Sequence, residues 1–449
     1  HKDSSVRYGK YFMITDYLSN KQEFEQQMQS NQLSYPIVIK PPTSGGTDGV
    51  RLCYTFEACQ KVVQRHLHQK NGEQHKNTSM MAQEFLDGEE YVVNTVSYDS
   101  NHKFTDIWRA YKSFHVDTRI RKKDDEEEAQ SEQPLSAKRE EKENEDENEE
   151  EKDAVKDEKL YPFSMLYDYQ EFEQDITTNG KMQLIVQYVE TVLNALGVKY
   201  GCGHCEVMYL PKENRVCLIE LNARMHGGLP RATDLVGYNQ MTALALHHCD
   251  AGLFLVQLPK YYEPGNRRRF FDLLHEDEQE SMVKFDSLYG NGNSESEQDK
   301  KKKKKEDEKV TVRAIFLRSK VDGKLNMAKF IDVIPHLSTF KCFARSLVDI
   351  VEYWKEYKSV AQLYEQQLLL MEATKEENNA AENYEEEDAT GKAEIMQNLQ
   401  KTLKIIARIE EVEKTIDLIT CPGTVVLQGK KSDIEADYQS IRAMEDDFE

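Results

Sequence analysis

The 449-residue sequence has no long hydrophobic run, since no span approaches the roughly 18 uninterrupted apolar residues of a membrane-crossing helix. We therefore expect no membrane partner. The sequence also lacks the short-spaced cysteine framework of a small secreted domain, because its 8 cysteines are scattered along the chain. This scatter favours a reducing compartment, so we expect a cytoplasmic protein.

Basic side chains are also in short supply. The chain has 59 Lys and Arg against 81 Asp and Glu, and its net charge is -22. Nucleic-acid binding requires Lys and Arg gathered on one face, so no nucleic-acid partner is expected. The lysine run at residues 300–305 lies between polar and acidic flanks. We interpret it as a solvated loop rather than as a nuclear-import or nucleic-acid patch.

The negative charge is concentrated in a few stretches. Residues 121–160 alone hold 18 acidic and 9 basic side chains and no aromatic ring. Such a composition buries too little apolar surface to fold, so solvated inserts are predicted. They cover residues of about 118–160, 291–309 and 372–394. The apolar share of the whole chain, 39%, is adequate for two domains, which we expect at residues 1–252 and 253–449.

Hydrophobic periodicity and turn residues predict the main elements. The expected helices cover residues 4–18, 55–69, 181–196, 229–248, 347–371 and 392–414, and the expected C-terminal strands cover residues 310–317 and 322–330. Two neighbouring histidines, His247 and His248, lie in one of these helices and are expected to be packed rather than bound to a metal.

A glycine-rich segment follows a short apolar strand. The strand, residues 35–42, carries Lys40 near its end, and residues 43–50 then place three glycines among small hydroxyl residues. Such a backbone can approach an oxyanion closely and direct N–H groups at it. The segment is neither a Gly-Lys-Ser/Thr phosphate loop nor a dinucleotide fingerprint, because another strand follows at residues 50–54. A glycine-rich hairpin that covers phosphates fits best.

Two strands around residue 86 suggest an edge for a nucleotide base. Residues 80–83 read as an apolar strand that breaks at a turn and resumes at residues 91–97. The break leaves Glu84 to Leu86 as an edge with free backbone groups that can pair with an adenine. Glu90 is then placed to bind ribose hydroxyls.

Acidic and amide side chains gather on a predicted hairpin at residues 204–228. If the loop has four residues, Glu206 lies opposite Ile219, and if it has five, Glu206 lies opposite Glu220. Only the second register places both carboxylates on one face. Two such carboxylates repel each other unless a cation lies between them, and oxygen ligands that include Asn222 suit Mg²⁺ better than zinc. Arg224, two residues further on, can then reach phosphate oxygens.

Two other interpretations of the hairpin compete with a metal site. Acidic pairs on exposed hairpins are common. The sequence Cys202-Gly203-His204-Cys205 also matches the motif of disulfide isomerases, but those enzymes place the first cysteine at a helix N-terminus. Here the following residues read as a strand, which disfavours both a redox role and a zinc site.

Six of these features occur in one order and at one approximate spacing, and in this the chain resembles the ATP-grasp superfamily. The resemblance is closest to the carboxylate–amine ligase branch of L-amino-acid ligases and carnosine-synthase-like proteins, and it covers about residues 4–250 apart from the insert. It implies an α+β fold in which two α+β subdomains clasp ATP, with a C-terminal α+β accessory or lid domain. The matching features are Lys10, residues 39–41, 44–50 and 83–90, Glu206, and residues 220–228.

The resemblance implies roles for individual residues. The two lysines would hold the nucleotide phosphates, the glycine loop would close over them, and the 83–86 edge would line the adenine site. The implied nucleotide-binding residues are Lys10, Lys40, Ser44, Gly45, Gly46, Thr47, Gly49, Gln83, Glu84, Phe85, Leu86 and Glu90.

The remaining roles lie on the hairpin. Glu206, Glu220 and Asn222 would carry Mg²⁺ or Mn²⁺, and Arg224 together with Lys40 would act on the transferred phosphoryl group. The implied substrate residues are His226, Gly227 and Gly228. The implied reaction activates a small-molecule carboxylate with ATP and passes it to an amine, with amino acids as the expected substrates. A homodimer is left open.

Two other functions stay open on the sequence alone: an ATP-binding module without ligase turnover, and carboxylation of the biotin-carboxylase type. The family's Rossmann-like N-terminal domain has no counterpart in the sequence, which begins at His1, so we expect an upstream portion. ADP release measured with and without amino acids distinguishes the ligase from a simple binding module.

Overall fold

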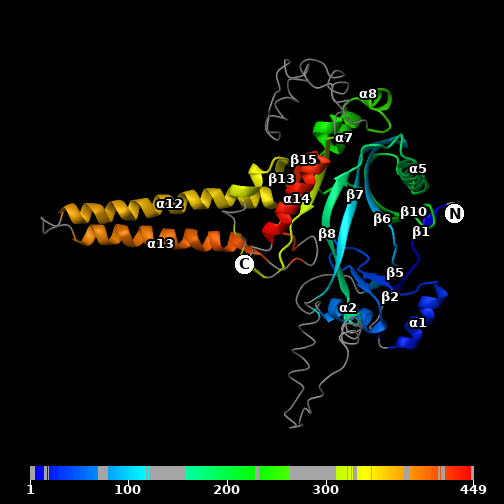
Figure 1. Ribbon diagram of the computed structural model, residues 1–449, viewed down its shortest axis with the longest axis horizontal. Helices are drawn as coiled ribbons and strands as arrows, with labels where there is room; N and C mark the ends of the chain where they lie inside the picture. The colour runs from blue at the N-terminus through cyan, green and yellow to red at the C-terminus, as the bar shows by residue number, and fades with distance from the viewer. Residues whose placement is uncertain are drawn as a thin grey trace, which may run out of the picture. The chain divides into compact units, whose positions relative to one another are not determined.

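The computed structural model describes most of the chain. The described residues are 6–14, 18, 20–68, 79–117, 120, 158–227, 232–262, 310–320, 322–324, 326, 331–344, 346–378, 385–412, 415 and 420–445. They fall into two compact units, His1–Lys305 with Ile416–Ile419, and Glu306–Thr415 with Thr420–Glu449 (Figure 1). Both units combine helices and strands, which confirms the predicted α+β class. No described helix is long and apolar enough to cross a membrane.

A mixed sheet forms the frame of the first unit. Its strand order is β1-β10-β9-β6-β7-β8-β4-β3-β5-β2, with β1 parallel to β10 and every other neighbouring pair antiparallel. The strands are β1 (Arg7–Tyr8), β2 (Tyr11–Ile14), β3 (Ile37–Lys40), β4 (Arg51–Cys53), β5 (Met80–Glu84), β6 (Glu89–Tyr98), β7 (Asn101–Val116), β8 (Phe163–Phe172), β9 (Gly201–Leu210) and β10 (Arg215–Asn222).

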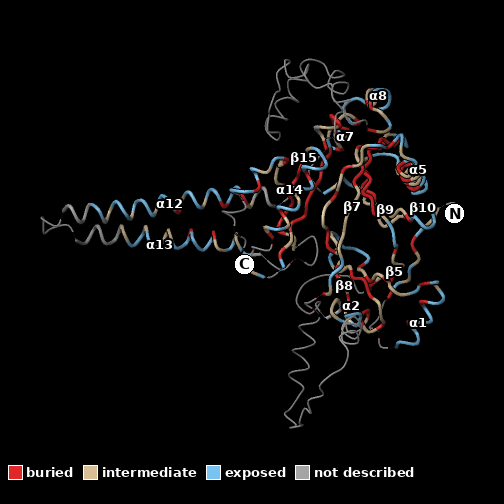
Figure 2. Tube along the Cα trace, in the orientation of Figure 1, coloured by how far each residue is buried: buried red, intermediate tan, exposed pale blue. Residues whose placement is uncertain are grey.

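Helices pack at both ends of this unit. They are α1 (Lys21–Ser30), α2 (Phe56–His68), α5 (Gly180–Ala195), α6 (Thr233–Val236), α7 (Gln240–Cys249) and α8 (Ala251–Val256). Figure 1 shows α1 and α2 beside the short strands β2 to β5, and α5, α7 and α8 at the other end. A core cluster joins Phe24 and Phe56 to Ile37 and Ile39, and Figure 2 shows that buried residues follow the strands. Two α+β lobes therefore share one sheet.

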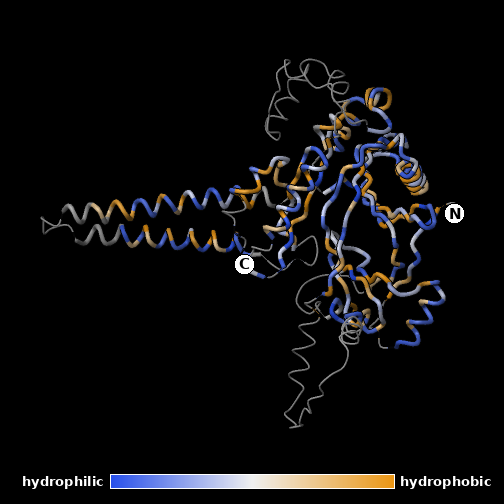
Figure 3. Tube along the Cα trace, viewed as in Figure 1, coloured by the Kyte–Doolittle hydropathy of each residue, from blue (hydrophilic) through white to orange (hydrophobic). Residues whose placement is uncertain are grey.

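Helix α5 is the clearest case of sequence dictating structure. Asn179 caps its first turn by accepting hydrogen bonds from the N–H groups of Lys181 and Met182. Gly197 follows the helix with φ of 70°, a left-handed conformation that glycine adopts without steric cost. Figure 3 colours the trace orange at the hydrophobic residues of this helix. The buried ones are Met182, Ile185, Val186, Val189, Val192 and Leu193. The predicted helix at residues 181–196 is confirmed to within one residue.

The predicted helix at residues 4–18 is wrong. The described residues there form β1 and β2, and β2 pairs with β5 from Tyr11 opposite Gln83 to Ile14 opposite Met80. An aromatic and β-branched run has a high strand propensity, and pairing to an existing edge outweighs the local helical pattern. The correction matters because β1 also extends the sheet beside β10.

The predicted single helix at residues 229–248 is also wrong. The described part forms α6 and α7, which Gly237 separates with φ of 87°. Asn239 then begins α7 with a capping box, in which its side chain and that of Thr242 bond reciprocally to backbone N–H groups. Of the two histidines predicted to be packed, His247 is buried in this helix and His248 is exposed.

The second unit contains a small sheet and a helical hairpin. Strand β15 (Thr424–Lys430) pairs antiparallel with β11 (Val310–Phe316) and β13 (Phe340–Ala344), and α14 (Lys431–Glu445) follows it. Helices α12 (Ser346–Asn378) and α13 (Glu385–Glu410) lie side by side (Figure 1). The remaining elements are β12 (Gly323–Lys324), β14 (Glu411–Val412) and the 3₁₀ helix η3 (Ile334–His336).

Two predictions for this unit need correction. The strand expected at residues 322–330 is only the two-residue β12 within the described residues. The insert expected at residues 372–394 is largely helical, because α12 reaches Asn378 and α13 begins at Glu385. Glu, Ala and Lys are strong helix formers, so a charged composition did not exclude a helix there. The inserts at 118–160 and 291–309 lie almost wholly outside the described residues, and the 1–252 and 253–449 division stays a prediction.

Candidate functional site

The hairpin of β9 and β10 brings two carboxylates face to face. Its loop has four residues, since Leu210 pairs with Arg215, yet Glu206 pairs with Glu220. A β-bulge between Leu218 and Glu220 supplies the extra residue that shifts the register. The structure therefore combines the shorter loop with the pairing that we expected only from the longer one.

Lysines surround this pair of carboxylates. Lys112 on β7 lies with its Nζ 2.7 Å from Glu90 Oε1, and the same Nζ lies 4.2 Å from the centre of the Tyr167 ring. Lys40, at the end of β3, is within electrostatic reach of both Glu206 and Glu220. We call Lys40, Glu90, Lys112, Glu206 and Glu220 the charge cluster. Its members come from five strands that are far apart in sequence.

Burial and charge oppose each other in the charge cluster. Burial lowers the pKa of Lys40, while the negative charges of Glu220 and Glu206 act in the opposite direction. Burial also acts to lower the pKa of Lys112, but Glu90, Tyr167 and Glu206 together outweigh it and raise that pKa. Burial raises the pKa of Glu90. For Glu206 burial acts to raise the pKa, and the neighbouring His204 and Lys112 lower it. The His204 hydrogen bond and the Lys112 charge keep Glu206 ionised inside the unit.

The oxygen ligands of Glu206, Glu220 and the neighbouring Asn222 partly fit a hard divalent cation. Glu206, Glu220 and Asn222 present only oxygen ligands, and Asn222 already donates its Nδ2 to Glu220 Oε1 at 2.7 Å. No group of three or more His, Cys, Asp or Glu side chains converges on one point among the residues that the structure describes. Two carboxylates and an amide still suit Mg²⁺, which takes most of its ligands from water and substrate phosphates.

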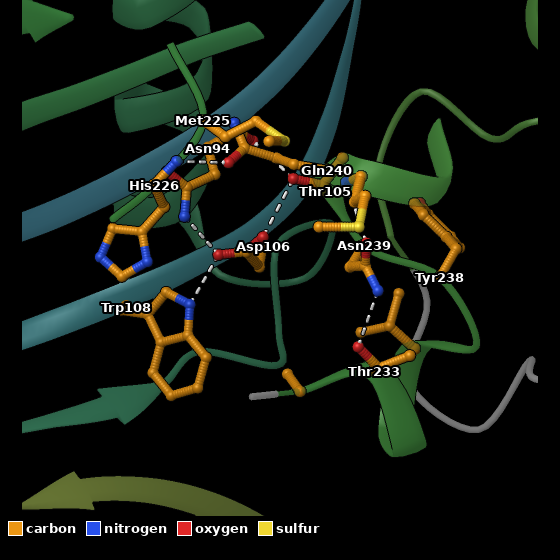
Figure 4. Close-up of a pocket in the computed structure, with 13 residues that line it drawn as sticks. Asn94, Thr105, Asp106, Trp108, Met225, His226, Thr233, Tyr238, Asn239 and Gln240 are labelled. Atoms are coloured by element: carbon orange, nitrogen blue, oxygen red, sulfur yellow. Dashed lines mark hydrogen bonds between the residues drawn. The ribbon is translucent and has the colours of Figure 1, made fainter. Parts of the chain in front are cut away.

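A row of polar groups runs from the charge cluster to a cavity, and Figure 4 shows the end of this row at the cavity. His204 Nε2 lies 3.5 Å from Glu206 Oε1, and its Nδ1 lies 2.9 Å from Asn94 Oδ1. Asn94 in turn donates its Nδ2 to Asp106 Oδ1 at 2.5 Å, and Trp108 Nε1 donates to the same oxygen at 2.6 Å. We call the space that these last residues line the Asp106 cavity.

The motif matches missed most of this row and also missed Lys112. Two-residue alternation places Asn94 and Glu90 on the same face of β6, and Asp106 and Trp108 on the same face of β7. That signal was present in the sequence. The alternation could not identify which strand pairs with β6, because that partner, β9, comes about a hundred residues later in the sequence.

The glycine loop joins β3 to β4 as predicted. Ser44 and Gly45 are exposed at its tip, and Thr47 donates its hydroxyl to the Gly46 carbonyl at 2.6 Å. Gly49 has φ of 70°, and a Cβ there would lie 2.8 Å from Pro41. Any other residue at this position would strain the backbone. The loop thus starts directly after Lys40, with its tip free to cover a bound group.

The strand edge predicted to bind the nucleotide base already uses one of its backbone groups in a hydrogen bond within the protein. Glu84 uses its backbone N–H to bond the Lys10 carbonyl at 2.9 Å, so this N–H is not free as expected. Its carboxylate accepts from Arg7 Nη2 at 2.7 Å and from the Lys10 N–H at 3.1 Å. Burial acts to raise the pKa of Glu84, but the Arg7 guanidinium holds it below its usual value. Lys10 extends its Nζ to the Gln32 carbonyl at 3.5 Å.

Apolar side chains lie around the next residues. Leu86 is buried with Leu210 and Cys217, and Phe85 contacts the Phe114 ring edge to face at 5.9 Å. Gln83 covers Gly9, where a Cβ would lie 2.8 Å from its Nε2. Such an apolar floor beside a strand edge suits a planar base. These nucleotide-binding roles stay predictions.

The residues after β10 are less closely placed. Because β10 ends at Asn222, strand alternation does not fix Arg224, which is exposed and donates to the Met225 carbonyl at 3.0 Å. The His226 ring lies 4.8 Å from the His204 ring, and the backbone N–H of His226 donates to Gln240 Oε1 at 2.8 Å. Gly227 is exposed, and Gly228 lies outside the described residues. Only His226 of this group is brought to the polar row.

The two cysteines of the Cys-Gly-His-Cys motif are both buried in β9. They are three residues apart on one strand, so their side chains point to opposite faces. Burial raises the pKa of Cys202 to about 11 and that of Cys205 to about 12. A reactive cysteine needs the opposite shift, so the motif has no redox geometry here.

Comparisons with known proteins agree with the motifs. No family model matches the chain. It is 23% identical over 281 residues to dapdiamide A synthase of Enterobacter agglomerans, which covers 59% of this chain and 54% of that protein. The chain thus spans about half the length of the curated relative it matches.

Solved structures give weaker likenesses. One is the L-amino acid ligase from Bacillus licheniformis, with a TM-score of 0.47, 12% identity, and coverage of 98% of this chain and 68% of that one. Another is the carboxyaminoimidazole ribonucleotide synthase from Aspergillus clavatus complexed with ATP, with a TM-score of 0.46, 8% identity, and coverage of 99% and 70%.

Proposed function

We propose that this chain, which has the ATP-grasp fold and resembles the carboxylate–amine ligases of that superfamily, is an ATP-dependent ligase. The reaction would join a small-molecule carboxylate, expected to be an amino acid, to an amine. The observation that carries the proposal is the pairing of Glu206 with Glu220 inside a cluster that also holds Lys40 and Lys112. Buried charges of both signs are costly, and such clusters mark functional sites.

The proposed reaction has two steps. A carboxylate oxygen attacks the γ-phosphorus of ATP, and the bond to the β-phosphate oxygen breaks to release ADP and form an acyl phosphate. The amine nitrogen then attacks the acyl carbon, phosphate leaves, and the nitrogen loses a proton to give the amide. The first step brings two anionic groups together, so positive charge must be in place beforehand.

The residues of this chain supply that charge. Lys40 and Lys112 would offset the negative charge of the phosphates, and Glu206, Glu220 and Asn222 would hold the metal ion. Bound Mg²⁺ or Mn²⁺ would add further positive charge at the phosphate oxygens. The glycine loop after Lys40 would keep water from the acyl phosphate until the amine arrives.

ADP release with and without a panel of amino acids tests the proposal, together with hydroxylamine trapping of an acyl phosphate as a hydroxamate. We expect amino-acid-dependent release and a trapped hydroxamate. Glu220→Gln should lower the rate about 1000-fold, because metal binding contributes several kcal/mol to catalysis. Glu190→Gln is the matched control, since Glu190 on α5 forms a partly exposed ion pair with Lys260.

Other outcomes would overturn the ligase. ADP release that ignores amino acids, or nucleotide binding without release, points to a binding module, and bicarbonate-dependent release points to carboxylation. Light scattering tests the proposed homodimer, and imaging of the tagged chain tests the cytoplasmic location.

A further inference from the structure

The Asp106 cavity is a second site within the first unit. Strands β6 and β7 supply Asn94, Asp106 and Trp108, and the chain after β10 supplies His226 and Tyr238 (Figure 4). Figure 4 shows the Asp106 carboxylate between the Asn94 amide and the Trp108 indole. No role in binding ATP or metal falls to these residues in the reaction proposed above. The cavity therefore has room for another part of the substrates.

Strand register connects the cavity to the charge cluster. Asn94 pairs with His204 on one side and with Asp106 on the other, and Glu206 lies two residues beyond His204. Neighbouring strands lie about 4.8 Å apart and two residues along a strand span about 7 Å, so the backbone of Asp106 lies about 12 Å from that of Glu206. A substrate whose reacting atom lies at the charge cluster reaches the cavity only with a group several bonds away.

The cavity wall has one sign of fixed charge. Asp106 is held by three neutral donors: the Asn94 amide, the Trp108 indole N–H and the Thr105 hydroxyl, the last at 3.0 Å. None of the described residues that line the cavity is Lys or Arg. Burial raises the pKa of Asp106, and these hydrogen bonds only partly oppose that effect. A largely buried carboxylate that has only neutral donors around it is stabilised further by a cationic group of the ligand.

The rest of the wall suits the carbon chain of such a ligand. Trp108 and Val236 are 3% and 2% exposed, and Met225 and Met241 also line the space. An indole face attracts an ammonium group, and thioether side chains adapt to a flexible chain. Asp106 itself is only partly covered, and its free surface faces this space (Figure 4).

We propose that the Asp106 cavity binds a cationic group of the substrate, an ammonium that lies several bonds from the reacting atom. Asp106 supplies the counter-charge and Trp108 the apolar face. Substrates that would place a carboxylate in the cavity are rejected, because like charges repel there without a cation to offset them. This inference rests on the proposed ligase and names its substrate class.

A panel of three amino acids of similar length tests the inference in the wild-type protein. Lysine carries a terminal ammonium, norleucine has the same chain without charge, and glutamate ends in a carboxylate. We expect the kcat/KM for amino-acid-dependent ADP release to be about tenfold higher for lysine than for norleucine, and lowest for glutamate. Equal values for lysine and norleucine, or a preference for glutamate, would overturn the inference.

Asp106→Asn then assigns the preference to its residue. The amide keeps the shape of the carboxylate but removes its charge, so the ratio of kcat/KM for lysine to that for norleucine should fall about tenfold. A purely structural role would lower both values equally and leave the ratio in place, which would contradict the proposal. If the variant fails to fold, Trp108→Phe should lower the same ratio by weakening the cation–π contact, and an unchanged ratio would contradict the proposal.

The failure of this inference differs from the failure of the ligase. If norleucine and glutamate support ADP release as well as lysine does, the ligase stands and the cavity has another use. If no amino acid changes ADP release and no hydroxamate forms, the ligase itself is wrong.

Discussion

The charge cluster and the Asp106 cavity share strands β6 and β7 but balance their charges differently. The charge cluster sets Lys40 and Lys112 against Glu90, Glu206 and Glu220. The cavity sets one carboxylate against neutral donors. A site that holds both positive and negative side chains can exchange its internal ion pairs for contacts with phosphates and a metal ion. A site of one sign is suited to a ligand of the opposite sign.

The two regions also differ in what holds them. The charge cluster depends on a register shift, since the bulge after Leu218 places Glu220 opposite Glu206. The cavity depends on side-chain hydrogen bonds, since Asp106 receives three of them within two neighbouring strands. Changes that remove charge should therefore damage the first region most, and changes in the helices near the cavity should damage the second.

The largest effect is expected for Lys112→Met. The variant leaves Glu90 buried without its cation, and an unpaired buried charge costs about 3 kcal/mol of unfolding free energy. Urea denaturation measures the loss, and ADP release should fall with it. Lys212→Met is the matched control, because the Lys212 side chain is 84% exposed beside Asp87 and its loss should leave the denaturation midpoint in place.

A double variant separates charge from shape in this prediction. Glu90→Gln combined with Lys112→Met removes the Glu90 charge that Lys112→Met leaves unpaired, so it should recover most of the stability that Lys112→Met loses, while ADP release stays low. If Lys112→Met unfolds at the same urea concentration as the wild type, the pair is solvated and the contrast between the two regions fails.

A smaller effect is expected for Tyr188→Phe, which acts on the bulge. The Tyr188 hydroxyl, on α5, donates to the Arg7 carbonyl at 2.6 Å and accepts from the Leu218 N–H at 2.9 Å. Its loss should cost about 1 kcal/mol and raise the Mg²⁺ concentration for half-maximal ADP release about fivefold, because the register beside Glu220 is less firmly held.

The control for this variant is Tyr209→Phe, which removes a hydroxyl bonded to Asn214 at the exposed turn of the same hairpin. It should not change the Mg²⁺ requirement. If the two variants behave alike, the bulge does not depend on Tyr188. Selectivity between lysine and norleucine should stay the same in both, because neither residue lies near the Asp106 cavity.

The sequence predicted most strands of the first unit and the residues of the charge cluster, except for Lys112. Alternation identified Glu206 and Glu220 as a pair in one of two registers, but a bulge at a single residue cannot be read from a periodic pattern. Lys112 can be identified as a site residue only through its ion pair with Glu90, which lies 22 residues earlier on the neighbouring strand. Local patterns indicate elements, and the contacts between them depend on the sheet order.

Of the residues that line the Asp106 cavity, only His226 was predicted as a site residue, for the same reason. Asn94, Asp106 and Trp108 are ordinary residues of a strand until β9 and α7 enclose them. The error at residues 4–18 has a related cause, since edge pairing to β5 decides the conformation of a segment that alone suits a helix. Composition also misled at residues 372–394, where helix propensity rather than charge decided the outcome.

The smallest effect, a pH dependence, is expected on the cavity side. His247 on α7 is 7% exposed, its ring packs on Tyr98 and Phe254 at 5.0 and 5.8 Å, and neither ring nitrogen has a hydrogen-bond partner within the described structure. Burial, and then the neighbouring His248, lowers its pKa. The unfolded chain thus binds this proton first as the pH falls through about 6.5, and stability falls with it.

Urea midpoints between pH 7.5 and pH 5.5 measure this loss, which His247→Phe should reduce because the replacement ring cannot take up a proton. His336→Gln, at an exposed position in the second unit, is the control and should keep the wild-type slope. Since α7 also carries Gln240 and Met241 of the cavity wall, selectivity for lysine should weaken at low pH before the Mg²⁺ requirement changes. If the Mg²⁺ requirement changes at a higher pH than the selectivity for lysine does, the charge cluster is no more stable to acid than the Asp106 cavity. The expected difference between the two regions then fails.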